Sequence, residues 1–133
     1  MPKFIPDILK DYILPFNWDV RKVWALNADV VQVPCFKFAY LLELPVWSSV
    51  PGRGLLFDIC PMDVIRNPNT SIYQTRRLRE AKLRYPIDVL VVEEMLWILD
   101  GVHKIAKHFA LDNPTLAVRF HNENIIQDIK LGW

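Results

Sequence analysis

The residues best suited to chemistry lie together in one short stretch, Asp100-Gly101-Val102-His103-Lys104. A carboxylate can cap a helix, hold a metal ion or accept a proton, and a glycine allows a ligand to approach the backbone closely. The imidazole and the ammonium group that follow add side-chain donors. If a helix begins here, its unpaired N–H groups and the positive end of its dipole favour an anion. The pattern therefore indicates a phosphate-binding site.

The apolar pattern after Gly101 decides whether a helix begins there. Asp-Gly between apolar runs is also typical of a β-hairpin. Residues 102–111 would have two mixed faces as a strand, whereas a helix gathers their apolar side chains on one stripe. Asp112-Asn113-Pro114 then ends the helix. We expect Asp100-Gly101 to join a strand to a helix, although a structural N-cap is an alternative role for Asp100.

Other motifs for cofactors and metals are absent from the sequence. It contains neither GxGxxG nor GxxxxGK[ST]. His103 and His108 would lie about 140° apart around a helix, so they do not form a metal-binding pair, and a metal site stays unknown. Cys35 and Cys60 lack CxxC spacing and are expected to be reduced core thiols.

The first half of the chain is expected to form short elements. Five prolines interrupt an aromatic-rich segment over residues 1–50, and Pro51 follows it. We predict a short helix near 20–26 with Asn17 or Asp19 as its N-cap, a strand over 30–33 and helical turns over 36–43. This region is interpreted as a packing layer. The alternative is a surface for a partner, which exposure of Trp18, Trp24 and Trp47 would favour.

The second half is expected to supply the sheet and the longer helices. We predict a strand over 55–59, a short helix from Pro61 to Asn67 and a helix over 71–85. Two apolar strands, 87–92 and 95–99, are expected to form a hairpin in the centre of the sheet. A further strand over 115–120 and a last helix over 122–129 follow. The predicted fold is α+β, with a small mixed β-sheet and packed helices.

The predicted helix over 71–85 is the most basic segment. It carries five cations and one acid, Glu80; the cations are Arg76, Arg77, Arg79, Lys82 and Arg84. One interpretation is a solvated helix face. The other is a basic strip that faces a nucleotide or a nucleic-acid backbone.

Composition limits the class of protein. The chain has 133 residues, 52% of them hydrophobic, and a formal net charge of +1. These values predict one domain over 1–133 with a real core and no general attraction to polyanions. The N-terminal sequence MPKFIPDILKDYILPF lacks a continuous apolar stretch, so no signal peptide is expected, and no segment is long enough to span a membrane. We therefore expect a cytoplasmic protein, with its oligomeric state undetermined.

The segment Ile98-Leu99-Asp100-Gly101-Val102-His103-Lys104-Ile105-Ala106, preceded by Tyr85-Pro86-Ile87 and followed by a turn and strand over 113–119, resembles a known family. It is similar to the ParB/sulfiredoxin-like fold, which includes the N-terminal domain of partitioning ParB proteins, sulfiredoxins and related free-serine kinases. The resemblance covers residues 56–122, between an aromatic-rich layer (1–55) and a C-terminal helix or tail (123–133).

The resemblance implies that Gly101, Val102, His103 and Lys104 surround nucleotide phosphates of ATP, ADP or CTP, with Mg²⁺ as a companion ion. It also implies catalytic roles for Asp100 and His103. Two positions depart from the family. Val102 stands where sulfiredoxins carry a reactive cysteine, so thiol chemistry is not expected. Lys104 replaces the usual arginine and loses its planar two-pronged contact.

The sequence therefore predicts a nucleotide-phosphate-binding protein that acts as a small-molecule kinase or nucleotide hydrolase. Whether it is an enzyme is left open. Two alternatives are a nucleic-acid-binding or nuclease-like domain, and a non-enzymatic interaction protein with a vestigial pocket. The basic segment over 76–84 favours the first alternative, and the aromatic N-terminal layer favours the second.

Overall fold

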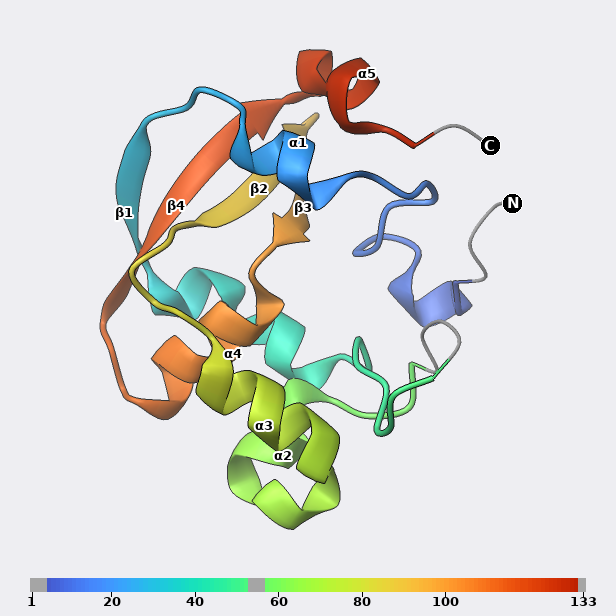
Figure 1. Cartoon of the computed structure of the whole chain (residues 1–133), viewed down its shortest axis with the longest axis vertical. Helices are drawn as coiled ribbons and strands as arrows, with labels where there is room; N and C mark the ends of the chain where they lie inside the picture. The colour runs from blue at the N-terminus through green and yellow to red at the C-terminus, as the bar shows by residue number, and fades with distance from the viewer. Residues whose placement is uncertain (1–4, 53–56, 132–133) are drawn as a thin grey trace. The chain divides into compact units, whose positions relative to one another are not determined.

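A computed structural model of the chain describes residues 5–52 and 57–131. Its four-stranded mixed sheet has the order β1-β4-β2-β3, and helices accompany it (Figure 1). The strands are β1 (Val30–Pro34), β2 (Ile87–Val92), β3 (Met95–Asp100) and β4 (Thr115–Asn122). This architecture confirms the predicted α+β class.

The chain divides into two compact units built from interleaved segments. The first unit contains residues 5–31, 86–101 and 117–131, and the second contains residues 32–52, 57–85 and 102–116. Each unit is described separately below.

The first unit is built on the β2–β3 hairpin, which the sequence predicted. Val92 pairs with Met95, so Glu93 and Glu94 form a two-residue turn. Both glutamates have positive φ, 49° and 70°, as a type I′ turn requires, although such turns usually use glycine or asparagine. On its other side β2 pairs in parallel with β4, from Ile87 opposite Val118 to Val91 opposite Asn122.

The predicted central position holds for β2 but is wrong for β3, which lies at the edge of the sheet. An apolar strand can occupy an edge when other parts of the chain cover its faces. Here the segment around Leu14 and Phe16 packs with Leu99, and Trp97 packs against the same cluster. In β3 only Leu99 is fully buried, and Leu96, Trp97 and Ile98 are half-buried.

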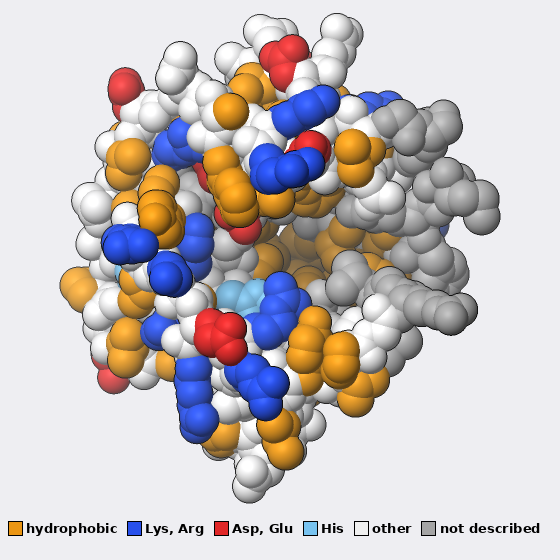
Figure 2. Space-filling view, in the orientation of Figure 1, with side chains coloured by type: hydrophobic (Ala, Val, Ile, Leu, Met, Phe, Trp, Pro, Cys, Tyr) orange, Lys and Arg blue, Asp and Glu red, His pale blue; other side chains and the backbone are white. Residues whose placement is uncertain are grey.

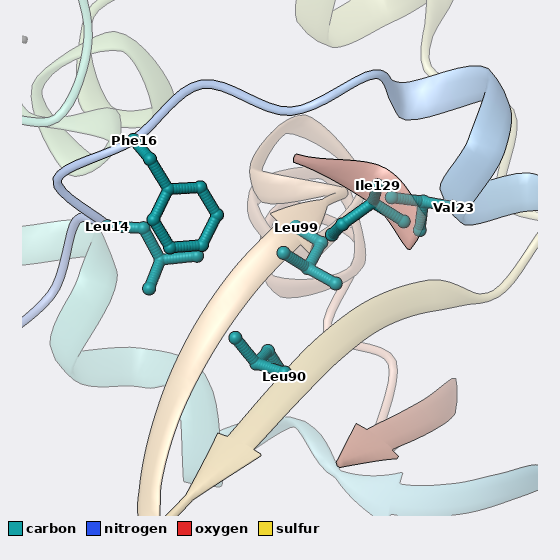
Figure 3. Packing of buried hydrophobic residues seen from close by; sticks show 6 residues of the cluster. All are labelled: Leu14, Phe16, Val23, Leu90, Leu99 and Ile129. Carbon is teal, nitrogen blue, oxygen red and sulfur yellow. The ribbon is translucent and has the colours of Figure 1, made fainter. Parts of the chain in front are cut away.

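The core of the first unit joins the sheet to short helices. Leu90 and Leu99 come from the hairpin, while Val23 and Ile129 come from α1 (Val20–Trp24) and α5 (Ile126–Ile129) (Figure 3). Asp19 caps α1 by accepting a hydrogen bond from the Arg21 N–H, as the sequence predicted. The remaining short helices of this unit are the 3₁₀ helices η1 (Asp7–Leu9) and η4 (Glu123–Ile125).

The second unit is mainly helical. Its elements are the 3₁₀ helices η2 (Cys35–Glu43) and η3 (Pro68–Thr70) and the helices α2 (Pro61–Arg66), α3 (Ile72–Glu80) and α4 (Val102–Ala110). Helices α2, α3 and α4 pack side by side, and η2 packs on α2 and α4 (Figure 1). The α2 and α4 predictions are confirmed, including Pro61 in the first turn of α2 and the end of α4 before Pro114.

Two predictions in this unit are wrong in extent. The helix predicted over 71–85 ends at Glu80, where Lys107 from α4 donates hydrogen bonds to the carbonyl oxygens of Arg79 and Ala81 at 2.7 and 2.8 Å. A cation at the end of a helix satisfies its last carbonyls and favours termination there. Of the strand predicted over 55–59, residues 55 and 56 lie outside the described residues, and Ile59 forms only an isolated bridge with Trp47.

Within residues 5–52 and 57–131, no helix has the length and apolar character needed to cross a bilayer.

Candidate phosphate-binding site

The predicted strand-to-helix junction is confirmed. Strand β3 ends at Asp100, Gly101 follows with a φ of +126°, and α4 begins at Val102. Residues with a side chain rarely adopt this φ, and a Cβ at position 101 would lie 2.5 Å from Cγ2 of Ile87. Both observations explain why glycine occupies the junction. Asp100 and Gly101 belong to the first unit, and Val102, His103 and Lys104 belong to the second.

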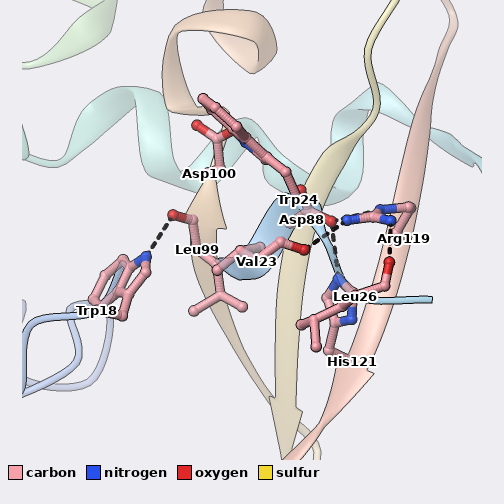
Figure 4. A network of polar contacts seen from close by, with 9 residues as sticks. All are labelled: Trp18, Val23, Trp24, Leu26, Asp88, Leu99, Asp100, Arg119 and His121. Atoms are coloured by element: carbon pink, nitrogen blue, oxygen red, sulfur yellow. Dashed lines mark hydrogen bonds and ion pairs between the residues drawn. The ribbon is translucent and has the colours of Figure 1, made fainter. Parts of the chain in front are cut away.

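Asp100 contacts a tryptophan of α1. The Trp24 Nε1–H donates a hydrogen bond to Oδ2 of Asp100 at 2.7 Å, and the Trp18 Nε1–H donates to the Leu99 carbonyl at 3.0 Å (Figure 4). These two bonds tie the N-terminal segment to the end of β3. The carboxylate therefore has a clear structural contact within the first unit, whatever further role it has.

A buried charged cluster in the first unit was not predicted. From β4, Arg119 and His121 project toward Asp88 on β2 and contact its Oδ1 at 2.7 and 2.8 Å (Figure 4). The Arg119 guanidinium also donates to the carbonyl oxygens of Val23 and Leu26. Arg119 thus fixes the end of α1 to the sheet. The β2–β4 register, which the sequence pattern does not reveal, brings Asp88 opposite Arg119.

His103 is held inside the second unit. Its Nε2 lies 2.7 Å from Oε1 of Gln74, and its ring stacks on Trp47 with centroids 4.4 Å apart. Gln74 uses its NH₂ group to donate to the carbonyl of Ser48, so the amide oxygen faces the histidine. His103 must then carry its proton on Nε2, because two acceptors cannot form a hydrogen bond.

Electrostatics keep His103 neutral. Burial, followed by the nearby Arg77 guanidinium, lowers the pKa of His103 from 6.5 to about 3. With the proton on Nε2 and no net charge, the ring offers no cation to a phosphate at pH 7. The structure therefore supports a role for His103 in positioning the first turn of α4 against α3.

Lys104 belongs to a cationic and aromatic surface of the second unit. Its Nζ lies 5.9 Å from the centroid of the Tyr85 ring, and the Arg84 guanidinium lies 4.9 Å from the same centroid. Tyr85 is 51% exposed. A ring face attracts cations by about 0.5–1 kcal/mol at such sites. Lys104, in the first turn of α4, and Arg84 therefore both contact the Tyr85 ring.

The basic surface of α3 lies on the same unit. Lys and Arg side chains gather over this helix around a single acidic patch (Figure 2). Arg77 contacts Tyr73 through its guanidinium, 5.6 Å from the ring centroid. A groove of about 440 Å³ runs beside Arg76 and Arg79. This surface agrees with the interpretation of the segment as exposed and basic.

Across residues 5–52 and 57–131, no cluster of three or more His, Cys, Asp or Glu side chains could hold a metal ion. Cys35 and Cys60 are free, as predicted, and burial raises the pKa of both thiols.

The tryptophans of the aromatic N-terminal layer differ in exposure. Trp47 is buried, Trp18 is half-buried and Trp24 is 57% exposed. The layer therefore acts mainly in packing, and Trp24 combines exposure with its bond to Asp100.

A comparison of the chain with protein-family models, curated proteins and solved structures found no match.

Proposed function

We propose that the protein binds a nucleotide through its phosphates at the first turn of α4. The observation that carries the proposal is the pair of cations in contact with the Tyr85 ring, Lys104 in this turn and Arg84. The first N–H groups of a helix have no acceptor within it and lie at the positive end of its dipole. Fixed cations beside such a helix end favour a multiply charged anion over a neutral ligand.

The sharp turn at Gly101 supports the same proposal. With a φ of +126°, Gly101 turns the chain from the end of β3 directly into α4, so that the unpaired N–H groups of the helix begin one residue after the strand. In this proposal Val102 provides its backbone N–H group, and His103 positions the first turn of α4 through its contacts with Gln74 and Trp47. Lys104 contributes charge. The similarity of the motif to ParB/sulfiredoxin-like proteins agrees with a nucleotide as the ligand.

The proposal concerns nucleotide binding alone, and phosphoryl transfer would be measured separately. In the related serine kinases the acidic residue of this motif takes part in phosphoryl transfer, which makes Asp100 the residue to test. Its carboxylate accepts a hydrogen bond from Trp24 in this structure. A nucleotide hydrolase or small-molecule kinase activity would add a chemical step to the binding described above.

Calorimetric titration with ATP, ADP and CTP, with and without magnesium, tests the proposal. We expect saturable binding below millimolar concentration, weakened at least about tenfold by Lys104→Gln because one charge-assisted contact contributes about 1.5–3 kcal/mol. Lys22→Gln removes an equal charge from exposed α1 and serves as the control. Absence of binding at millimolar nucleotide would overturn the proposal. Equal dissociation constants for the two variants would overturn its location, and release of phosphate during the titration would report turnover.

A further inference from the structure

The groove beside α3 has features that the nucleotide proposal does not use. Pro68 and Asn69 of η3 line it, together with residues of α3: Ile72, Thr75, Arg76, Arg79 and Glu80. Its volume of about 440 Å³ lies within the range of small-ligand sites. Thr75 is nearly fully buried and donates a hydrogen bond to the Pro68 carbonyl, which fixes η3 against α3.

The charge of this groove is not neutralised within the described part of the chain. None of the ion pairs in residues 5–52 and 57–131 involves Arg76 or Arg79. Both guanidiniums are exposed and lie three residues apart, so they share one face of α3. Planar guanidiniums in such a pair bind phosphate with two parallel hydrogen bonds.

An apolar side chain accompanies these cations. Ile72 is 72% exposed although it lines the groove. Tyr73 and Tyr85 add aromatic rings at the start of α3 and just after its end, each with an arginine over the ring. Cations interleaved with apolar and aromatic side chains are typical of surfaces that bind single-stranded nucleic acid. A duplex keeps its bases stacked inside, so they are not available to contact an apolar groove wall.

We propose that this groove binds a phosphate of single-stranded nucleic acid between Arg76 and Arg79, with the adjoining sugar or base against Ile72. A polyanion with a charge on every unit fits the repeated cations of the α3 segment better than a ligand with one carboxylate does. Glu80 is the single acid of the groove lining and lies one helical turn after Arg76, so the two arginines exceed it by one positive charge.

Fluorescence anisotropy with a labelled fifteen-residue oligothymidylate tests this assignment. A duplex of equal length and a labelled oligoglutamate peptide are the competing ligands. The variant is Arg76→Gln/Arg79→Gln. The control is Lys22→Gln/Lys37→Gln, which removes two exposed lysine charges elsewhere. Circular dichroism melts should match for both, because neither pair has a packing role in the described structure.

We expect the single strand to bind more tightly than the duplex or the peptide. The arginine variant should lose at least tenfold in affinity, and its slope of log Kobs against log salt should become less negative by about 0.7, the loss of one phosphate contact on a single strand. The control variant should keep most of its affinity and most of its salt dependence. Equal losses in the two variants would overturn the groove as the site, and preference for the peptide or duplex would overturn the class of ligand.

The same proteins separate this inference from the nucleotide proposal. Arg76→Gln/Arg79→Gln should bind ATP as the unaltered protein does, whereas Lys104→Gln should bind the oligonucleotide within about threefold of it. If both variants lost binding to ATP and to the oligonucleotide, the two ligands would share one site, and the groove would not be a separate site.

Discussion

Replacement of Gly101 by alanine tests the physical basis of the strand-to-helix junction. The φ of +126° at this position costs an L residue about 1–3 kcal/mol. The new Cβ would also lie 2.5 Å from Cγ2 and 2.8 Å from Cβ of Ile87, a buried residue of β2. Relief of such overpacking typically costs about 1–3 kcal/mol more. We therefore expect Gly101→Ala to lower the free energy of unfolding by about 2–6 kcal/mol.

Urea denaturation followed by tryptophan fluorescence measures this loss, and Gly52→Ala is the matched control. Gly52 has no heavy atom within 4 Å of the site that a Cβ would occupy, so its replacement should change stability by less than about 0.5 kcal/mol. Ile87→Ala should itself destabilise, but combined with Gly101→Ala it should cost about 0.5–1.5 kcal/mol less than the sum, because it removes the clash with Cγ2 while the Cβ at 2.8 Å remains. Stability of Gly101→Ala equal to that of the control, or additive single effects, would refute the reasoning.

Two further predictions concern buried polar groups. Arg119→Met should lower the free energy of unfolding by about 3–5 kcal/mol, since it leaves the buried Asp88 carboxylate without its guanidinium. Asp88→Leu/Arg119→Met should recover only part of that loss, because His121 and the carbonyl oxygens of Val23 and Leu26 lose these partners. A single-variant cost below about 1 kcal/mol in urea denaturation would contradict the clamp. The lowered pKa of His103 predicts that stability falls as pH drops from 6.5 toward 3, because the unfolded chain takes up a proton that the folded ring refuses. His103→Gln should remove up to about 1.4 kcal/mol per pH unit from that slope, and parallel pH profiles of the two proteins would show that the ring is not held neutral.

The sequence alone determined local structure well where the signals were local. Proline and asparagine bounded α2, Asp19 capped α1, and the apolar stripe of residues 102–110 identified α4 and with it the junction at Gly101. These features depend on backbone conformation and on neighbours within one turn of helix, and such preferences are encoded in adjacent residues. For the same reason the α+β class and the position of the candidate site followed from the sequence.

Only the tertiary structure decided which groups meet over long separations. The edge position of β3, the end of α3 under Lys107 and the pairing of Asp88 with Arg119 each depend on segments distant in sequence. His103 shows the consequence for function. Its spacing indicated a phosphate donor, but Gln74 and Trp47 desolvate it and keep its ring neutral. A side chain's type is fixed by the sequence, whereas its charge at a given pH is set by the environment that folding builds around it.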